Sequence, residues 1–192
     1  MDKIIKVIAG PNGSGKTTFA ESFVVSTKPI VPFLNPDLIA AGFDISNSEK
    51  ASFQAGRVLL KEIKDKISKG ESFSFESTLS GLTYSSILRE ARNQGYKIQI
   101  YFIFLKKVSL NISRIKKRVS LGGHHIPTMT VRRRHLRCFE NFWTIYKPLA
   151  DEWLILDNST TKPKLIHNSN SYEKLTAYEK NIFTKKILKG SL

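Results

Sequence analysis

The chain has 192 residues, of which 41% are hydrophobic and 24% are charged. This balance is typical of a globular domain and argues against a fibre, a repeat array or a disordered tail. A single cysteine excludes a disulfide framework. The apolar run that follows Met1 covers about seven residues, which is too short for a signal peptide or a transmembrane helix. We therefore expect a cytoplasmic protein with no membrane partner.

The chain is strongly basic. It has 31 Lys and Arg against 16 Asp and Glu, a net charge of +15. Such a surface attracts nucleic acid, an acidic membrane, an acidic protein or a nucleotide, and charge alone does not choose among them. The excess is concentrated, because the segment from Ala91 to Phe139 contains 12 Lys or Arg and no Asp or Glu.

Strands and helices are predicted to alternate along the first half of the chain. A helix that opens with the capping box of Ser46 and Glu49 carries an apolar stripe spaced by four residues, from Ala55 through Leu59 and Ile63 to Ile67, and Gly70 provides a left-handed end. The predicted strands cover residues 3–9, 30–34, 72–75 and 97–105. Two further helices are expected from residue 15 and over 82–94.

The second half continues the pattern with two helices, over 110–121 and 131–149, and two short strands, over 153–156 and 164–167. Residues 122–127 cannot be helical throughout, and this break predicts a mobile lid over about residues 114–134. Strands joined by helices form a parallel sheet covered on both faces, so we expect a three-layer α/β sandwich. The domain is predicted over 1–170, with 171–192 as its surface helix and tail.

A phosphate-binding loop follows the first strand. Residues 10–17, Gly-Pro-Asn-Gly-Ser-Gly-Lys-Thr, fit G-x-x-x-x-G-K-[ST] between a buried strand and a helix, and they do not fit the dinucleotide pattern G-x-G-x-x-G. Lys16 would bridge β- and γ-phosphate oxygens, and the Thr17 hydroxyl would bind Mg²⁺. The alternative is a glycine turn with an exposed lysine. The nucleotide-binding residues are predicted to be Gly10, Pro11, Asn12, Gly13, Ser14, Gly15, Lys16, Thr17 and Thr18.

Two carboxylates follow the strands that should end beside this loop. Asp37 follows the second strand and can accept the proton of an attacking hydroxyl, or it is a turn aspartate after Pro36. Glu76 follows the third strand and can orient a substrate hydroxyl or hold a Mg²⁺-bound water, or it caps the next helix.

Arginines of the basic segment can neutralise a transferring phosphoryl group. Arg114 and Arg118 share one helix face, and Arg132, Arg133 and Arg134 open the next helix. The alternative is a solvated basic face or a nucleic-acid patch. Other residues of this region are expected in the core: Cys138, Tyr101, Phe102 and Phe104.

These motifs together resemble the zeta toxin family of P-loop kinases, particularly its short single-domain members. The resemblance covers about residues 4–167 and includes 9–18, 35–37, 75–78, Arg118, the Gly-Gly-His-His-Ile-Pro break at 122–127, and 132–134. It implies a fold like that of shikimate and adenylate kinases, ATP or GTP as donor with Mg²⁺, and the 3′-hydroxyl of the amino sugar in UDP-N-acetylglucosamine as acceptor. A small antitoxin protein is the implied partner, and the charge of this chain suits an acidic one.

The resemblance also assigns roles to residues. Lys16, Asp37, Arg118 and Arg133 are the predicted catalytic residues, with Asp37 as base. The predicted substrate-binding residues are Asp37, Glu76, Thr78, Arg114 and His124.

Two other functions remain open at this stage. The basic segment would also suit a nucleic-acid-associated P-loop ATPase or polynucleotide end kinase, although the sequence has no helix-turn-helix, aromatic RNA-binding motif or zinc spacing. A nucleotide-binding regulator without turnover is the third hypothesis, against which Asp37 and the arginines argue.

Overall fold

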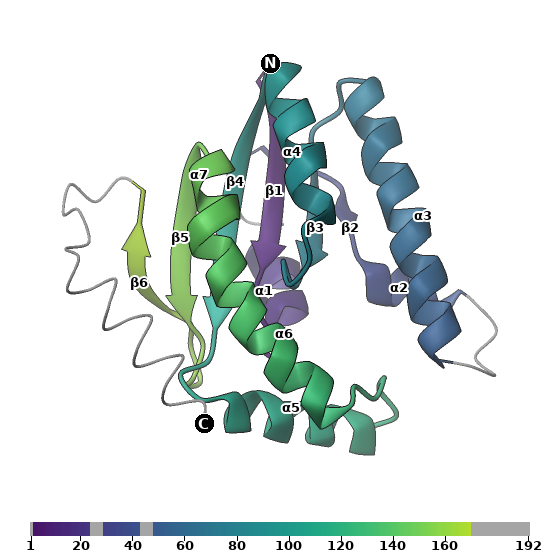
Figure 1. The fold of residues 1–192 in the computed structure, drawn as a ribbon, viewed down its shortest axis with the longest axis vertical. Coiled ribbons are helices and arrows are strands. Elements are labelled where there is room, and N and C mark those ends of the chain that lie inside the picture. Colours follow the sequence, from purple (N-terminus) through teal and green to yellow (C-terminus); the bar gives the residue numbers. More distant parts are fainter. Residues whose placement is uncertain (1, 24–28, 43–47, 170–192) are drawn as a thin grey trace.

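A computed structural model describes residues 2–23, 29–42 and 48–169. The predicted cap at Ser46 and the predicted tail over 171–192 lie outside these ranges. The described residues form a six-stranded sheet with helices on both faces (Figure 1).

The strands are β1 (Lys3–Ala9), β2 (Phe33–Leu34), β3 (Phe73–Ser77), β4 (Tyr96–Phe104), β5 (Glu152–Asp157) and β6 (Lys164–Asn168), in the order β2-β3-β1-β4-β5-β6. All neighbours pair in parallel except β5 and β6. The prediction of a mostly parallel sheet is confirmed. Ala9 pairs with Ser77 of β3 and with Phe102 of β4, so the segments that follow β1 and β3 leave the sheet at the same level.

The helices are α1 (Lys16–Phe23), α2 (Pro36–Ala41), α3 (Ser48–Ser68), α4 (Thr83–Asn93), α5 (Val108–Ser120), α6 (Thr128–Asn141) and α7 (Lys147–Leu149), with a π-helical turn η1 (Phe142–Tyr146) between the last two. In Figure 1, α4 and α6 lie in front of the sheet, α1 lies behind it, and α5 crosses below the carboxyl ends of the strands. The predicted three-layer sandwich is therefore confirmed.

The two faces of β1 supply two parts of the core. Ile5, Val7 and Ala9 pack with the helices of the front face. Ile8 instead packs with Ala20 of α1. The stripe predicted for α3 is confirmed, because each of its four residues is buried: Ala55, Leu59, Ile63 and Ile67. The residues predicted for the core near α6 and β4 are buried as well: Cys138, Tyr101, Phe102 and Phe104.

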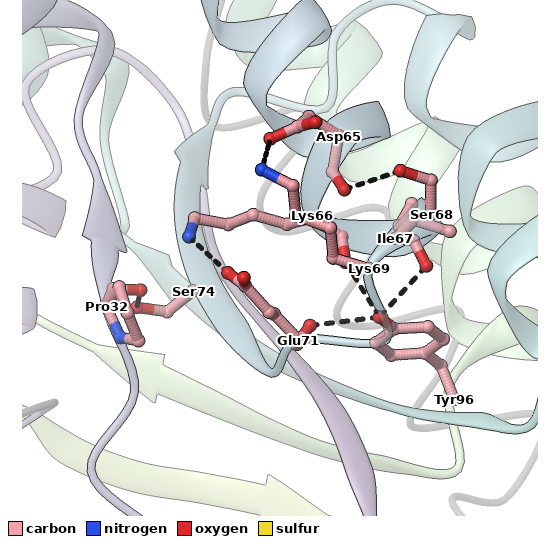
Figure 2. A network of polar contacts seen from close by, with 9 residues as sticks. All are labelled: Pro32, Asp65, Lys66, Ile67, Ser68, Lys69, Glu71, Ser74 and Tyr96. Carbon is pink, nitrogen blue, oxygen red and sulfur yellow. Dashed lines mark hydrogen bonds and ion pairs between the residues drawn. The ribbon is translucent and has the colours of Figure 1, made fainter.

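Strand β2 is shorter than predicted. Residues 30–34 were expected to form it, yet only Phe33 and Leu34 pair, and Ile30 is 70% exposed. Pro29 and Pro32 lack the N–H that a ladder requires. The carbonyl of Pro32 nevertheless accepts hydrogen bonds from the backbone N–H and the hydroxyl of Ser74, at 2.8 and 3.0 Å, which fixes the register of this edge (Figure 2).

Helix α3 ends as the sequence predicts. Gly70 has a φ of +70°, and the N–H of Glu71 donates to the carbonyl of Lys66 over 3.0 Å. The Tyr96 hydroxyl, at the start of β4, lies within 3.4 Å of the carbonyl oxygens of Lys66, Ile67 and Glu71 and donates to this group (Figure 2). This hydroxyl thereby joins the start of β4 to the end of α3.

The long helix predicted over 131–149 begins earlier, at Thr128, and contains the π-helical turn η1. Within this stretch Lys147 lies between two indole rings. Its Nζ is 4.5 Å from the ring centre of Trp143 and 4.6 Å from that of Trp153 in β5. This cation–π arrangement joins the end of the helix to the start of the strand.

Candidate active site

The glycine-rich loop between β1 and α1 has the backbone that its sequence requires. Gly10 and Gly13 have φ angles of +144° and +74°, which L side chains rarely adopt. A Cβ at Gly10 would overlap the carbonyl oxygen of Ile103, and one at Gly13 would lie 2.7 Å from that of Asn111. Glycine is therefore required here both by conformation and by close packing.

Two buried or half-buried amides from other elements hold this loop by hydrogen bonds to its carbonyls. Asn111 of α5 donates from Nδ2 to the carbonyl of Asn12, and Asn158 after β5 donates from Nδ2 to the carbonyl of Ser14, both at 2.8 Å. Arg114 in turn donates to the carbonyl of Asn158 at 2.8 Å. Neither Asn111 nor Asn158 could be predicted from the sequence, because no short motif marks an amide that supports a loop from another element.

Lys16 is buried, which rules out the alternative of an exposed lysine in a glycine turn. Its side chain is 5% exposed, and Nζ donates to the carbonyl of Pro11 at 3.1 Å. The same Nζ lies 3.5 Å from Oε1 of Glu76, whose side chain is 11% exposed. The ammonium group is thus fixed inside the loop, where a phosphate would lie.

Glu76 also accepts a 2.8 Å hydrogen bond from the Thr17 hydroxyl through Oε2. The carboxylate therefore binds the side chains of both Lys16 and Thr17. A hydroxyl and a carboxylate are the hard oxygen ligands that Mg²⁺ prefers, so the residues present fit this ion. In addition, Oδ1 of Asn12 and Oγ of Ser14 are buried with no hydrogen-bond partner among the described residues.

A cleft of about 820 Å³ opens above the loop. It brings together most of the predicted site residues: Asn12, Gly13, Gly15, Lys16, Thr17, Thr18, Glu76, Thr78, Arg114, Arg118 and His124. Gly10, Pro11 and Ser14, which are buried residues of the loop, are not part of its wall. Asp37 lies in α2, between the lining residues Pro36 and Ala40, and its side chain lies outside the described part of the structure.

A second cleft of about 630 Å³ adjoins the first between α3, α4 and α6. Tyr84, His124, Ile126 and Arg134 line both clefts. Arg133, predicted to act at the phosphate, lines the second cleft alone, whereas its neighbour Arg134 lies on both walls. The sequence could not separate these adjacent arginines, because the answer depends on the rotation of α6 relative to the sheet.

Within the predicted lid, a side chain of α5 binds the break at residues 122–127. Arg118 donates to the carbonyl oxygen of His124 at 2.9 Å, across the turn that begins after α5. This bond places the guanidinium beside the break at residues 122–127 and on the wall of the first cleft.

The segment after Glu76 contains a strained residue that the sequence does not reveal. Leu79 is buried and has a φ of +52°, a left-handed conformation that costs a branched or bulky residue roughly 1 kcal/mol or more. Asn141 of α6 donates to the Leu79 carbonyl at 2.8 Å, and the Ser77 hydroxyl accepts from the Leu79 N–H at 3.1 Å. These bonds fix the turn that carries Thr78 into the cleft.

A parallel sheet with a glycine loop between β1 and α1, and helices on both faces, is the fold of the P-loop kinases. The family model of the zeta toxins matches residues 2–170. The chain therefore belongs to the zeta toxin family, as the motifs predict.

One sequence relative and two solved structures illustrate the similarity, and the structures, at 13% and 16% identity, show the fold alone. A protein of Haemophilus influenzae, described as uncharacterized, is 34% identical over 126 residues, which cover 66% of this chain and 88% of that protein. A solved chain from the PezAT chromosomal toxin-antitoxin system of Streptococcus pneumoniae aligns with a TM-score of 0.68 at 13% identity, over 98% of this chain and 84% of that one. A chain of the AvrRxo1-ORF1:-ORF2 structure with ATP aligns with a TM-score of 0.65 at 16% identity, over 88% of this chain and 58% of that one.

Within residues 2–23, 29–42 and 48–169, no helix combines the length and the apolar character needed to cross a bilayer.

Proposed function

We propose that the chain is a kinase that transfers the γ-phosphoryl group of ATP or GTP to a hydroxyl group of a nucleotide sugar. The acceptor we expect is the 3′-hydroxyl of UDP-N-acetylglucosamine. The observation that carries the proposal is the convergence of Lys16, Thr17 and Glu76 at the floor of a cleft that continues into a second one. Membership of the zeta toxin family supports the reaction class, and the relative solved with ATP supports the donor.

The loop residues 10–18 would bind the donor phosphates. The backbone N–H groups of the loop and the N-terminus of α1 are suited to the β-phosphate, and the Lys16 ammonium to the oxygens between the β- and γ-positions. Binding of the nucleotide would exchange the contact of Lys16 with Glu76 for contacts with phosphate. Mg²⁺, held by Thr17 and Glu76, would supply positive charge to the phosphate oxygens.

Asp37 is the proposed general base. It is the second residue of α2, the helix that follows β2 and whose Pro36 and Ala40 line the nucleotide cleft. A carboxylate there can accept the proton of the attacking hydroxyl as the oxygen bonds to phosphorus. Glu76 and Thr78 would hold the acceptor near this position, together with Arg114 and His124.

Arg118 and Arg134 would neutralise the charge of the transferring phosphoryl group. Both line the nucleotide cleft, and both belong to helices that flank the break at residues 122–127. A lid over residues 114–134 would exclude water from the site, which a kinase needs because water would otherwise hydrolyse the donor. We assign Arg133 to the acceptor side, because it lines the second cleft.

The protein partner we infer is a small acidic antitoxin. The support is the family and the toxin-antitoxin relative, together with the net charge of +15. We propose that residues 1–170 form the kinase domain and that residues 171–192 belong to the same domain.

The test is incubation of the protein with ATP, Mg²⁺ and UDP-N-acetylglucosamine, followed by mass spectrometry and phosphorus NMR. We expect a mass increase of one phosphoryl group on the sugar, and none with the Lys16→Ala variant. If only another hydroxyl compound is phosphorylated, the proposed acceptor is wrong and the proposed kinase activity stands. If ATP is hydrolysed and its phosphoryl group is transferred to no small hydroxyl compound, the proposal of a kinase is wrong.

A further inference from the structure

The turn between β3 and α4, residues 78–82, forms part of the wall of the nucleotide cleft. Thr78 and Ser80 line this cleft, and Tyr84, in the first turn of α4, lines both clefts. The turn begins two residues after Glu76, whose carboxylate binds the P-loop side chains. The conformation of the β3–α4 turn therefore sets where these groups lie relative to the P-loop.

This conformation is strained and is held by side chains from elsewhere in the chain. Leu79 has a φ of +52°, which a bulky residue adopts only where the surrounding structure requires it. Asn141, the last residue of α6, donates from Nδ2 to the Leu79 carbonyl at 2.8 Å. Tyr146, the last residue of η1, donates from its hydroxyl to the Gly81 carbonyl at 2.6 Å. One helical segment thus binds two carbonyls of the same turn.

The π-helical turn η1 explains how both side chains reach the β3–α4 turn. It begins directly after Asn141 and ends at Tyr146. In an α-helix, at about 100° per residue, residues five apart are separated by about 140° around the axis and face different directions. A π-helix bonds residue i to residue i+5 and so brings positions five apart to nearly the same side. The π-helical turn thereby aligns the two donors.

The Tyr146 hydroxyl also binds the start of α4. The side chain is fully buried. Burial raises the pKa of Tyr146 to about 12, and hydrogen bonds from the backbone N–H groups of Ser85 and Tyr84 oppose this rise. The hydroxyl therefore stays protonated near neutral pH and donates to Gly81 while it accepts from N–H groups that the first turn of a helix leaves free.

The same helix carries Arg134 to both clefts. Arg134 precedes Asn141 by seven residues, which is two turns of α6, so the two side chains lie within about 20° of the same helix face. The guanidinium proposed to neutralise the transferring phosphoryl group and the amide that holds the β3–α4 turn are therefore parts of one rigid element.

We propose that Asn141 and Tyr146 are positioning residues for phosphoryl transfer. They hold the β3–α4 turn in the strained conformation in which Thr78 presents the acceptor hydroxyl to the P-loop. Neither residue lines a cleft, so both act through the turn. The inference rests on the proposed kinase function and deepens it, because it makes the placement of the acceptor depend on α6 and η1.

Tyr146→Phe is the sharpest test, because it removes the hydroxyl and keeps the ring. We expect kcat with UDP-N-acetylglucosamine to fall about 10- to 100-fold and KM for ATP to stay unchanged, since a displaced acceptor slows transfer while the P-loop is intact. Asn141→Ala should act in the same way. The double variant should lose less than the product of the two effects, because both bonds hold one turn.

Tyr96→Phe is the matched control. It removes a hydroxyl that lies among three carbonyls at the end of α3 and the start of β3, outside both clefts. This variant should be destabilised and should keep the parental kcat. If kcat falls equally in Tyr96→Phe and Tyr146→Phe, the effect is one of stability and the positioning role is wrong.

Hydrogen–deuterium exchange without substrates separates this inference from the kinase function. Amides of residues 77–85 should exchange about tenfold faster in Tyr146→Phe than in the parent, and at the parental rate in Tyr96→Phe. A parent that phosphorylates no hydroxyl compound contradicts the kinase proposal, and the exchange rates still decide whether Tyr146 holds the turn. Parental kcat in Tyr146→Phe, or unchanged exchange of the turn, would overturn the positioning role and leave the kinase intact.

Discussion

Nδ2 of Asn111 lies 2.8 Å from the carbonyl oxygen of Asn12, to which it donates, although the two residues are 99 positions apart. The bond joins the predicted lid helix α5 to the phosphate loop. Asn111 is fully buried, so the amide and the carbonyl can satisfy each other only here. The shape of the loop therefore depends on the position of α5.

Replacing Asn111 with Ala should lower the free energy of unfolding by about 1–3 kcal/mol, because a fully buried side chain and its hydrogen bond to the Asn12 carbonyl are lost. It should also weaken ATP binding several-fold, because the loop loses its support. Denaturant unfolding and calorimetric titration of ATP measure the two effects. Ser113→Ala, an exposed position of the same helix, is the control. Unchanged ATP affinity in a destabilised variant would show that the bond serves stability alone.

Lys16→Ala should lower kcat by roughly 10²-fold or more, because the cation that stabilises charge between donor phosphates is lost. The loss also leaves the Glu76 carboxylate, 11% exposed, without the ammonium at 3.5 Å. We therefore expect Lys16→Met to be at least as inactive and Lys16→Arg to recover little. Circular dichroism establishes that each variant is folded. A folded Lys16→Ala variant with full turnover would contradict the P-loop assignment.

Asp37→Asn should retain ATP binding and lower kcat by roughly 10²- to 10⁴-fold, because an amide cannot accept the proton of the attacking hydroxyl. The pH–rate profile supplies the second readout, since the acidic limb of kcat should disappear in the variant. Loss of ATP affinity with kcat preserved would assign Asp37 to nucleotide binding instead.

The free energy of unfolding should fall as the pH is lowered from 7 toward 4, because His135 is buried in its neutral form. Burial lowers the pKa of His135 from 6.5 to about 4, and the side chain is fully buried beside Phe139. Between these values the unfolded chain binds a proton that the folded chain does not, so about 3 kcal/mol of stability is lost on acidification. His135→Leu should remove this slope in denaturant unfolding measured across the range.

Asp157 affects stability in a more acidic pH range than His135, so it does not interfere with the unfolding experiment on His135. Burial opposes ionisation of Asp157, but hydrogen bonds from Ser159 and the Lys106 ammonium outweigh it and hold the pKa below its ordinary value of 3.8. The stability it contributes is present above that value and is lost at more acidic pH. A variant without His135 that keeps the full slope between pH 7 and 4 would contradict the assignment.

Arg118→Gln separates a phosphate-facing lid from a nucleic-acid surface. If the lid faces phosphate, this variant should lose roughly 10²-fold in kcat and bind nonspecific duplex DNA as the parent does. Arg137→Gln, an exposed position of α6, should leave kcat unchanged. A DNA-binding surface would instead show loss of duplex binding in both variants, a steep salt dependence and ATP hydrolysis stimulated by DNA.

The regular part of the fold could be predicted because it depends on periodic patterns. The stripe from Ala55 to Ile67 and the glycine at position 70 define α3 and its end, and the β-branched run before Gly10 defines the central strand. Helix α2 was not predicted. With six residues it is less than two turns long, so no apolar stripe can develop.

The candidate site could be predicted in its local part only. The loop motif gives Lys16 and Thr17, but it cannot give their shared contact with Glu76, which requires the pairing of β1 with β3. Asn111 and Asn158 depend on tertiary placement in the same way. The choice between Arg133 and Arg134 depends on a rotation of about 100° per residue around α6.

The stack of Lys147 between Trp143 and Trp153 makes the intrinsic fluorescence of this protein a selective signal. The chain has two tryptophans, and both flank the same ammonium group where the helix end meets the start of β5. Neither of them lines the two clefts. Their emission therefore reports the integrity of the helix–strand junction, and titrations with nucleotide or sugar require an introduced fluorophore near the lid.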